Sequence, residues 1–532
     1  MEKIDPIQLE IFKNLFSSIA EEMGYTLKRT SFSPNIKERR DYSCAIFDCK
    51  GDMVSQAAHI PVHLGSMPMS VKAILQECPP SKNSMAIVND PFRGGTHLPD
   101  VTIIAPVFLN ESKNPLFYVA NRAHHSDIGG MTAGSMPIST SIFQEGVIIP
   151  PLLLVRDNEI DESVLRLITS NVRTTEERRG DFKAQVMANN IGIRRMRETI
   201  DKYGAELTSF YAKALQEYTE NITRRTIKDI KDGVYEFEDY LDDDGIGIES
   251  IKIKVAIRIE EDNLIADFSG SSKQVMGSVN AVEAITLSAL IYSVRCLMPE
   301  DLPTNEGIFK PIKLITEKGS VVNAEFPAAV AGGNVETSQR IVDVILGALS
   351  NAVPDKICAA SQGTMNNIAL GGFDHYRKKN FAYYETIGGG MGAYRGGNGE
   401  SAIHSHMTNT LNTPIEALEY DYPILIREYS IRKNSGGNGE YKGGNGIVRE
   451  IQFLTDTEVT VLSERRKYSP YGIFGGGSGL CGRNIVIRKG KYEDRAGKFY
   501  EKMNSEDILR IETPGGGGYG SAEKKNGDAD LK

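Results

Sequence analysis

The chain has 532 residues, 40% of them hydrophobic and 25% charged, a composition typical of a globular protein long enough for several domains. Its formal net charge of −9, with acidic and basic residues mixed along the chain, excludes the basic footprint of a nucleic-acid-binding protein. No apolar run approaches the roughly 18 residues of a membrane span, and the first residues lack the pattern of a secretory signal. Six cysteines without a C-x-x-C pair do not indicate a disulfide framework, so we expect a cytoplasmic protein.

The N-terminal region is predicted to begin with a helix and to continue as buried strands. Asp5 can cap this helix, Pro6 fits its first position, and apolar residues at helical spacing carry it to about Gly24. Between residues 40 and 155, short apolar segments alternate with Gly, Pro, Asn and Asp, a pattern that indicates strands joined by loops. These segments are SCAIFD, SMAIVND, VTIIAPVFL, LFYVANRAHH and GVIIPPLLLV.

Helices and further strands follow. We predict helices over 175–203 and 205–231, and a hairpin formed by IKIKVAIRIE and LIADFSG. The expected fold is multi-domain mixed α+β with a strand- and glycine-rich C-terminal half. We expect an N-terminal metal-site region (1–204), a helical and mixed α/β region (205–395), a β-rich glycine-loop region (396–520) and a disordered tail (521–532).

Glycine clusters mark the last third of the chain. They include ETIGGGMGAYRGGNGE, SGGNGEYKGGNG, FGGGSG and TPGGGGYG. Such clusters form turns between short strands, the interpretation we favour, or allow a backbone to approach another backbone or a ligand closely. Two of them match G-x-G-x-x-G/A, but neither leads into a helix, and no Walker A motif is present. We therefore expect no nucleotide site on this chain.

Histidine is concentrated in one part of the sequence. Five of the eight histidines, at positions 59, 63, 97, 124 and 125, fall between residues 59 and 125. His97 and Asp100 should lie on a loop that enters a strand, because Pro99 separates them. His124 and His125 end another strand just before Asp127, and Asp41 stands at the entry to a third. Two imidazoles and two carboxylates would suit Zn²⁺ or Mn²⁺ better than Ca²⁺ or Mg²⁺. A buried structural His–Asp pair is the alternative.

Several longer motifs carry a resemblance to a known family. They include RTSFSPNIKERRDYSCAIFD, HIPVHLGSM, NDPFRGGTHLPDV, NRAHHSDIGG, RGDFKAQ, GGNVETSQRI, HSHMTNTLNTPIEALE and TPGGGGYG. Together they resemble the hydantoinase B/oxoprolinase family from about Asp5 to Gly520. The resemblance implies the metal-carrying subunit of an ATP-dependent hydrolase that opens a hydantoin, 5-oxoproline or a lactam. The alternative that it implies is the alpha-type subunit of an ATP-dependent ketone carboxylase.

The resemblance also implies partners and site residues. ATP would bind to a separate hydantoinase A-type subunit, so that a hetero-oligomer acts on a small-molecule substrate without nucleic acid or membrane. The implied metal ligands are Asp41, His97, Asp100 and His124, with His125 or Asp127 as substitutes. His59, His63, His404 and His406 are further candidates for orienting ligands or contacting substrate. His404 and His406 should alternate on a strand, which would turn one of them inward.

Overall fold

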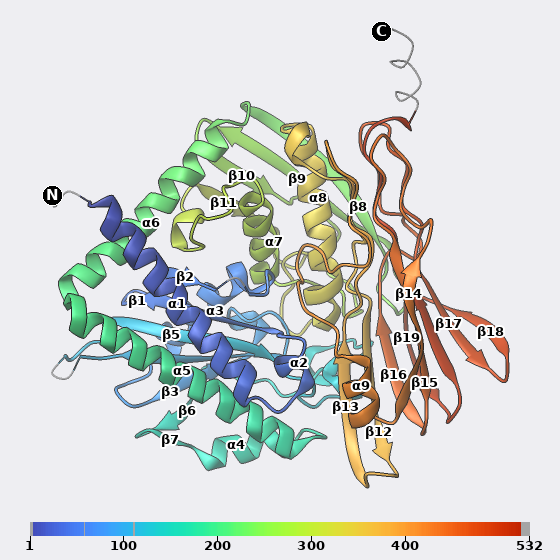
Figure 1. Ribbon diagram of the computed structural model, residues 1–532, viewed down its shortest axis with the longest axis horizontal. Helices are drawn as coiled ribbons and strands as arrows, with labels where there is room; N and C mark the ends of the chain where they lie inside the picture. Colours follow the sequence, from blue (N-terminus) through green and yellow to red (C-terminus); the bar gives the residue numbers. More distant parts are fainter. Residues whose placement is uncertain (1–3, 58, 110–111, 523–532) are drawn as a thin grey trace.

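Helices and several separate sheets build this molecule, and they confirm the expected multi-domain α+β fold (Figure 1). The computed structural model describes residues 4–57, 59–109 and 112–522. The tail predicted over 521–532 therefore lies almost wholly outside the described residues. Within the described ranges, no helix combines the length and the apolar character needed to cross a membrane.

A seven-stranded sheet has the strand order β2-β1-β5-β4-β3-β6-β7, and the candidate metal ligands lie on its strands or directly beside them. All five strands expected between residues 40 and 155 belong to it. Neighbouring strands in this sheet are antiparallel, for example β1 with β5 and β5 with β4. The strands are β1 (Tyr42–Asp48), β2 (Met53–Gln56), β3 (Met85–Val88), β4 (Asp100–Val107), β5 (Phe117–His124), β6 (Leu152–Arg156) and β7 (Glu159–Ile160).

Helices cover both faces of this sheet, so its central strands are buried throughout (Figure 1). The helices α1 (Pro6–Thr30) and α5 (Thr175–Tyr203) pack on one face, and α3 (His63–Glu77) packs on the other. Asp5 caps α1 as predicted, because its Oδ1 accepts a hydrogen bond of 2.9 Å from the backbone N–H of Ile7. The helix α1 continues past Gly24, since Leu27 extends the buried stripe.

A second sheet, with the order β11-β10-β9-β8, packs against the helices α6 and α8, and α8 in turn packs against α7. The predicted hairpin forms its centre, where β9 and β10 pair antiparallel. Its strands are β8 (Gly233–Asp243), β9 (Glu249–Glu260), β10 (Asn263–Asp267) and β11 (Ile312–Ile315). The helices here are α6 (Ala205–Lys228), α7 (Glu283–Arg295) and α8 (Ser338–Ser350), the last preceded by a π-helical segment at Gly333–Thr337.

The last third of the chain folds into two sheets that enclose a separate apolar core, at the right of Figure 1. Their orders are β13-β12-β16-β19 and β14-β15-β20-β17-β18. The strands are β12 (Asn367–Asp374), β13 (Lys379–Glu385), β14 (Ile424–Arg432), β15 (Gly446–Phe453), β16 (Thr457–Leu462), β17 (Arg483–Arg488), β18 (Lys491–Arg495), β19 (Lys498–Met503) and β20 (Ile508–Glu512). Shorter helices along the chain are α2 (Pro34–Lys37), α4 (Glu162–Thr169) and α9 (Ile415–Asp421).

The glycine clusters mainly bring backbones together, which differs from the turn-forming role that the sequence favoured. Four segments far apart in the chain lie against one another and exchange backbone hydrogen bonds. Gly437 N–H donates to the carbonyl of Gly516 at 2.8 Å, and Gly516 N–H donates to the carbonyl of Gly444 at 2.9 Å. A Cβ on Gly516 would lie 2.0 Å from the carbonyl oxygen of Met391, so no other residue fits there without moving a backbone.

We predict that Gly516→Ala lowers the free energy of unfolding by about 3 kcal/mol, because the added methyl meets rigid backbone. The matched control is Gly490→Ala, where a Cβ would meet nothing within 4 Å and only the positive φ of 76° is unfavourable. That control should lose about 1 kcal/mol. Denaturant unfolding of both variants measures the difference, and equal losses would contradict the close approach.

Candidate metal centre

Two neighbouring strands bring the predicted site residues together. Asp100 is the first residue of β4 and His124 is the last residue of β5, and the two are direct partners in the antiparallel register. Opposite residues of an antiparallel pair project to the same face of a sheet. His97 lies on the loop that enters β4, as expected from Pro99. The three side chains therefore converge at one end of the strand pair.

The side chains of His97, Asp100 and His124 form a compact buried cluster. Each offers one ligand atom, and these atoms lie within 4.8 Å of one another. All three residues are buried. The Nε2 atom of His124 and the Nδ1 atom of His97 are buried without a hydrogen-bond partner. Two imidazoles, one carboxylate and unpartnered nitrogen atoms fit a transition metal ion of the Zn²⁺ or Mn²⁺ type.

Asp100 is an ionised carboxylate at the middle of this cluster. Burial alone would raise the pKa of its carboxyl, but His97 and His63 beside it hold that pKa well below its usual range. The Nε2 atoms of His97 and His63 lie 3.4 and 3.5 Å from Asp100 Oδ2. Burial also lowers the pKa of His124 well below its usual value, which keeps this imidazole neutral. A neutral imidazole and a carboxylate are the protonation states that bind metal.

Asp41 lies beside the cluster but outside the group of three that share the 4.8 Å limit. It immediately precedes β1, and its backbone carbonyl accepts a hydrogen bond of 3.0 Å from the N–H of His124. Burial raises the pKa of the Asp41 carboxyl to about 7, while Arg39 opposes this shift. The carboxyl also interacts electrostatically with Asp100 and His97. Asp41 thus belongs to the same electrostatic environment as the cluster.

The ring of His124 is held from two sides by residues that sequence reasoning missed. Asn35 Nδ2 lies 3.0 Å from His124 Nδ1 and donates to the His124 carbonyl at 2.7 Å. Arg39 donates to Asn35 Oδ1, which fixes the orientation of this amide. Tyr384 stacks on the His124 ring with centroids 4.5 Å apart, and the Arg39 guanidinium lies over the same tyrosine. Such contacts restrict the ring to one orientation.

Asn334 contacts the cluster from the π-helical segment. Its Nδ2 atom lies 3.0 Å from His97 Nε2 and 3.5 Å from Asp100 Oδ2. Short π-helical segments inside helices are frequent at functional sites. The motif GGNVETSQRI is visible in the sequence, but no local pattern marks its asparagine as part of the site, so Asn334 was missed.

The proposed substitutes, His125 and Asp127, are engaged elsewhere. His125 Nε2 lies 3.0 Å from Gln185 Oε1, and its ring stacks on Phe182, both on α5. Asp127 accepts hydrogen bonds from the backbone N–H and the guanidinium of Arg173. Adjacent side chains at a strand end point to opposite faces, which separates His125 from His124.

The four remaining candidate histidines fall in three places. His63 begins α3 and contacts Asp100, whereas His59 lines a separate cavity with Tyr42 and Arg40. His404 and His406 line a third region together. The strand expected for them is wrong, because neither belongs to a strand and His406 adopts a φ of 55°. A left-handed residue breaks the alternation of side chains, so both imidazoles reach one cavity.

Comparisons with known proteins identify the family. The model of the family "Hydantoinase B/oxoprolinase" matches residues 5–522. A 5-oxoprolinase from Dictyostelium discoideum is 41% identical over 98% of this chain, which corresponds to 41% of that protein. The putative B-type subunit of a D-/L-hydantoinase from a Pseudomonas species is 29% identical over 98% of this chain and 91% of that protein. The crystal structure of an ATP-dependent caprolactamase from Pseudomonas jessenii superimposes with a TM-score of 0.91 and 26% identity, covering 98% and 92% of the two chains.

The chain belongs to the hydantoinase B/oxoprolinase family, which confirms the resemblance seen in the sequence. It spans about two fifths of the length of the 5-oxoprolinase that it matches, and nearly the full length of the hydantoinase subunit. The activities of the longer relatives are therefore proposals for this chain.

Two buried acids near the centre have raised pKa values. Burial raises the pKa of Glu145 to about 7 and that of Glu336 to about 8. Glu336 accepts hydrogen bonds from the backbone N–H of Met365 and from Asn367, and Asn367 accepts one from the Tyr384 hydroxyl. Glu336 is thus linked to the tyrosine that stacks on His124 and is protonated near neutral pH.

We predict that Glu336→Gln makes the protein more resistant to heat at alkaline pH. The folded chain binds a proton at Glu336 that the unfolded chain releases above its ordinary pKa of 4.5, so stability falls as pH rises from that value through about 8. The amide mimics the protonated acid and removes this loss. Thermal melts should agree at pH 5 and differ by about 1–3 °C at pH 9 in favour of the variant. Parallel pH profiles would contradict the assignment.

Proposed function

We propose that this chain is the metal-carrying component of an ATP-dependent enzyme that hydrolyses a cyclic amide. The observation that carries the proposal is the buried cluster of His97, Asp100 and His124 in a chain of this family. The 5-oxoprolinase relative supports a ring amide as the substrate class, and the caprolactamase neighbour supports ATP dependence. No observation on this chain favours ketone carboxylation, so cyclic-amide hydrolysis is the function we retain.

We further propose that ATP is used on a companion polypeptide. The 5-oxoprolinase relative extends far beyond the region matched here, and the Pseudomonas relative is by its name one subunit of a hydantoinase. Both facts support a second component. In a longer relative it would be part of the same polypeptide, and for this chain it would be a separate one. The absence of a Walker A motif in the sequence agrees with this division. The companion would activate the amide, and this chain would complete hydrolysis.

The residues of this chain have distinct roles in the proposal. His97, Asp100 and His124 would hold a Zn²⁺ or Mn²⁺ ion, with Asp41 as the fourth residue of the set. A bound ion of this kind polarises a carbonyl group and makes a water molecule more acidic. Asn35 and Tyr384 hold the His124 ring, and Asn334 positions His97. Burial excludes bulk water, which strengthens every charge interaction in the site.

The proposal predicts about one transition metal ion per chain in protein purified without chelator. His97→Ala should lower the metal content at least about tenfold, because one of the clustered donors is removed. The control is His375→Ala, which changes an exposed histidine far from the described cluster in sequence. Elemental analysis by mass spectrometry gives the readout. Wild-type protein that contains no zinc or manganese and takes up neither on titration would refute the metal site.

The proposal also predicts that ring opening requires both components. With a co-expressed companion and ATP, the complex should convert 5-oxoproline or caprolactam to the open amino acid, while this chain alone should hydrolyse neither the amide nor ATP. His97→Ala should reduce ring opening by about 100-fold or more, and His375→Ala should leave it unchanged. Ring opening by this chain alone would contradict the division of labour.

A further inference from the structure

The side-chain amide of Asn334 lies among the ligand atoms of the metal cluster. Its Nδ2 atom is 3.0 Å from His97 Nε2 and 3.5 Å from Asp100 Oδ2, and these two atoms are 3.4 Å from each other. Ligands that bind one ion at about 2.1 Å lie about 3.0–3.5 Å apart when their bonds to it form angles of roughly 90–110°. The three atoms therefore have the spacing of neighbouring ligands around a single ion.

Two other side chains near the cluster are less well placed to add a ligand. His63 Nε2 lies 3.5 Å from Asp100 Oδ2, and its Nδ1 is bonded to Ser43 Oγ at 2.8 Å. Neither His63 nor Asp41 belongs to the group whose ligand atoms share the 4.8 Å limit. Asn334 contacts two members of that group through one end of its amide. This double contact favours Asn334.

The oxygen of the Asn334 amide does not fix the orientation of the side chain. Oδ1 is buried and has no hydrogen-bond partner, whereas Nδ2 lies against His97 Nε2. A positive ion bound to that nitrogen and to Asp100 would repel the N–H group and attract the carbonyl oxygen. The two ends of an amide have nearly the same size. Rotation about the Cβ–Cγ bond therefore exchanges them in the same space and breaks no hydrogen bond of Oδ1.

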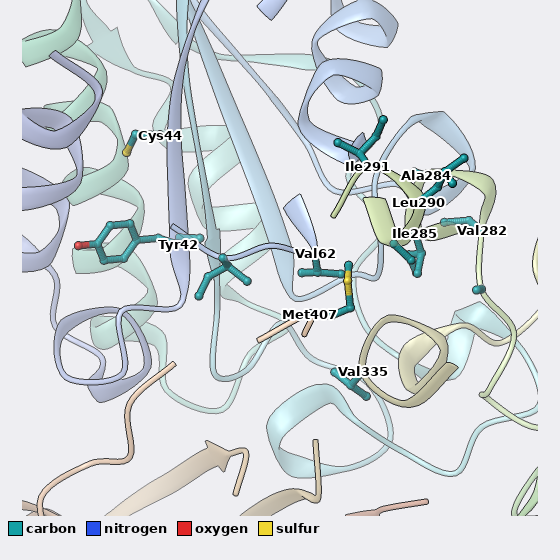
Figure 2. Close-up of a cluster of buried hydrophobic side chains, with 14 of the residues drawn as sticks. Tyr42, Cys44, Val62, Val282, Ala284, Ile285, Leu290, Ile291, Val335 and Met407 are labelled. Carbon is teal, nitrogen blue, oxygen red and sulfur yellow. The ribbon is translucent and has the colours of Figure 1, made fainter. Parts of the chain in front are cut away.

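The backbone that carries Asn334 is held closely in place. A Cβ on Gly333 would lie 1.9 Å from the carbonyl oxygen of Asn280, so these two backbones are in tight contact. On the other side of Asn334, Val335 is 2% exposed and belongs to the same cluster of buried apolar side chains as Met407 (Figure 2). A side chain on a fixed backbone loses little freedom when it binds an ion.

We propose that Oδ1 of Asn334 is a further ligand of the metal ion, beside His97, Asp100 and His124. This proposal rests on the metal site of the proposed function and deepens it, because it adds a neutral carbonyl oxygen to the ligand set. A neutral ligand fills a position around the ion without cancelling its charge. The charge then remains available to polarise a carbonyl group or to make a water molecule more acidic.

Titration of the metal-free full chain with Co²⁺ tests this ligand, because Co²⁺ binds imidazole and carboxylate ligands and its visible absorption bands respond to them. Asn334→Ala should weaken Co²⁺ binding by about 10–100-fold and change the bands, because one ligand is lost. Asn334→Asp provides an oxygen in the same place but cannot donate a hydrogen bond. It should bind Co²⁺ at least as tightly as the wild-type protein. A residue that only donated hydrogen bonds to His97 or Asp100 would fail equally in both variants.

Ser338→Ala is the matched control. Ser338 Oγ donates a hydrogen bond of 2.6 Å to the carbonyl of Asn334, so this change disturbs the same segment and leaves the amide intact. Its Co²⁺ affinity and absorption bands should match those of the wild-type protein. Melting temperatures of the metal-free variants show whether each chain is folded. If Asn334→Ala does not fold, the comparison of Asn334→Asp with the wild-type protein decides.

Wild-type protein that takes up no Co²⁺ would refute the metal site, and with it both this ligand and the proposed function. Uptake by the wild-type protein, with the same affinity and bands in Asn334→Ala, overturns the role of Asn334 alone and leaves the proposed function standing. An Asn334→Asp variant that binds Co²⁺ as weakly as Asn334→Ala has the same meaning, and so does an equal loss in Ser338→Ala.

Discussion

The buried negative charge of Asp100 is the constraint on which the rest of the centre depends. A carboxylate removed from water is unfavourable unless other groups replace its hydration. Here Thr96 donates to Oδ2 at 2.5 Å, and His63, His97 and Asn334 surround the same oxygen. These groups come from the entry loop of β4, from α3 and from the π-helical segment. One charge thus requires three separate parts of the chain to meet at a fixed point.

The strands and the core of the centre were accessible from the sequence because they rest on local patterns. Short apolar runs bounded by turn residues indicated the strands, and Pro99 placed His97 on a loop rather than a helix. His124 and Asp100 were predicted at strand ends, and pairing of those ends brings them together. The resemblance then favoured His124 over His125 as a metal ligand. The strand geometry agrees with this choice, because His125 faces α5.

The parts that sequence reasoning missed depend on long-range packing. Every residue of α8 is buried, including the polar Gln339, Arg340 and Asp343, so polar residues in this helix do not mark a solvent-exposed face. Asn35, Asn334 and Tyr384 reach the cluster from positions far from one another in the chain, and no local spacing reports such contacts. The predicted strand at His404 failed for a local reason. A left-handed residue at His406 is not encoded by any glycine or asparagine at that position.

The layered glycine segments also constrain how the molecule is made. Their backbones come from near residues 390, 440, 475 and 516, and the last of these segments hydrogen-bonds with each of the other three. The chain is synthesised from its N-terminus, so the first three glycine segments are made before the fourth. Their polar backbone groups lack hydrogen-bond partners until the fourth segment has been synthesised. Tyr384, which stacks on His124, leads directly into the first of these layers. Assembly of the centre is therefore a late event in biosynthesis, although most of its charged residues are synthesised early.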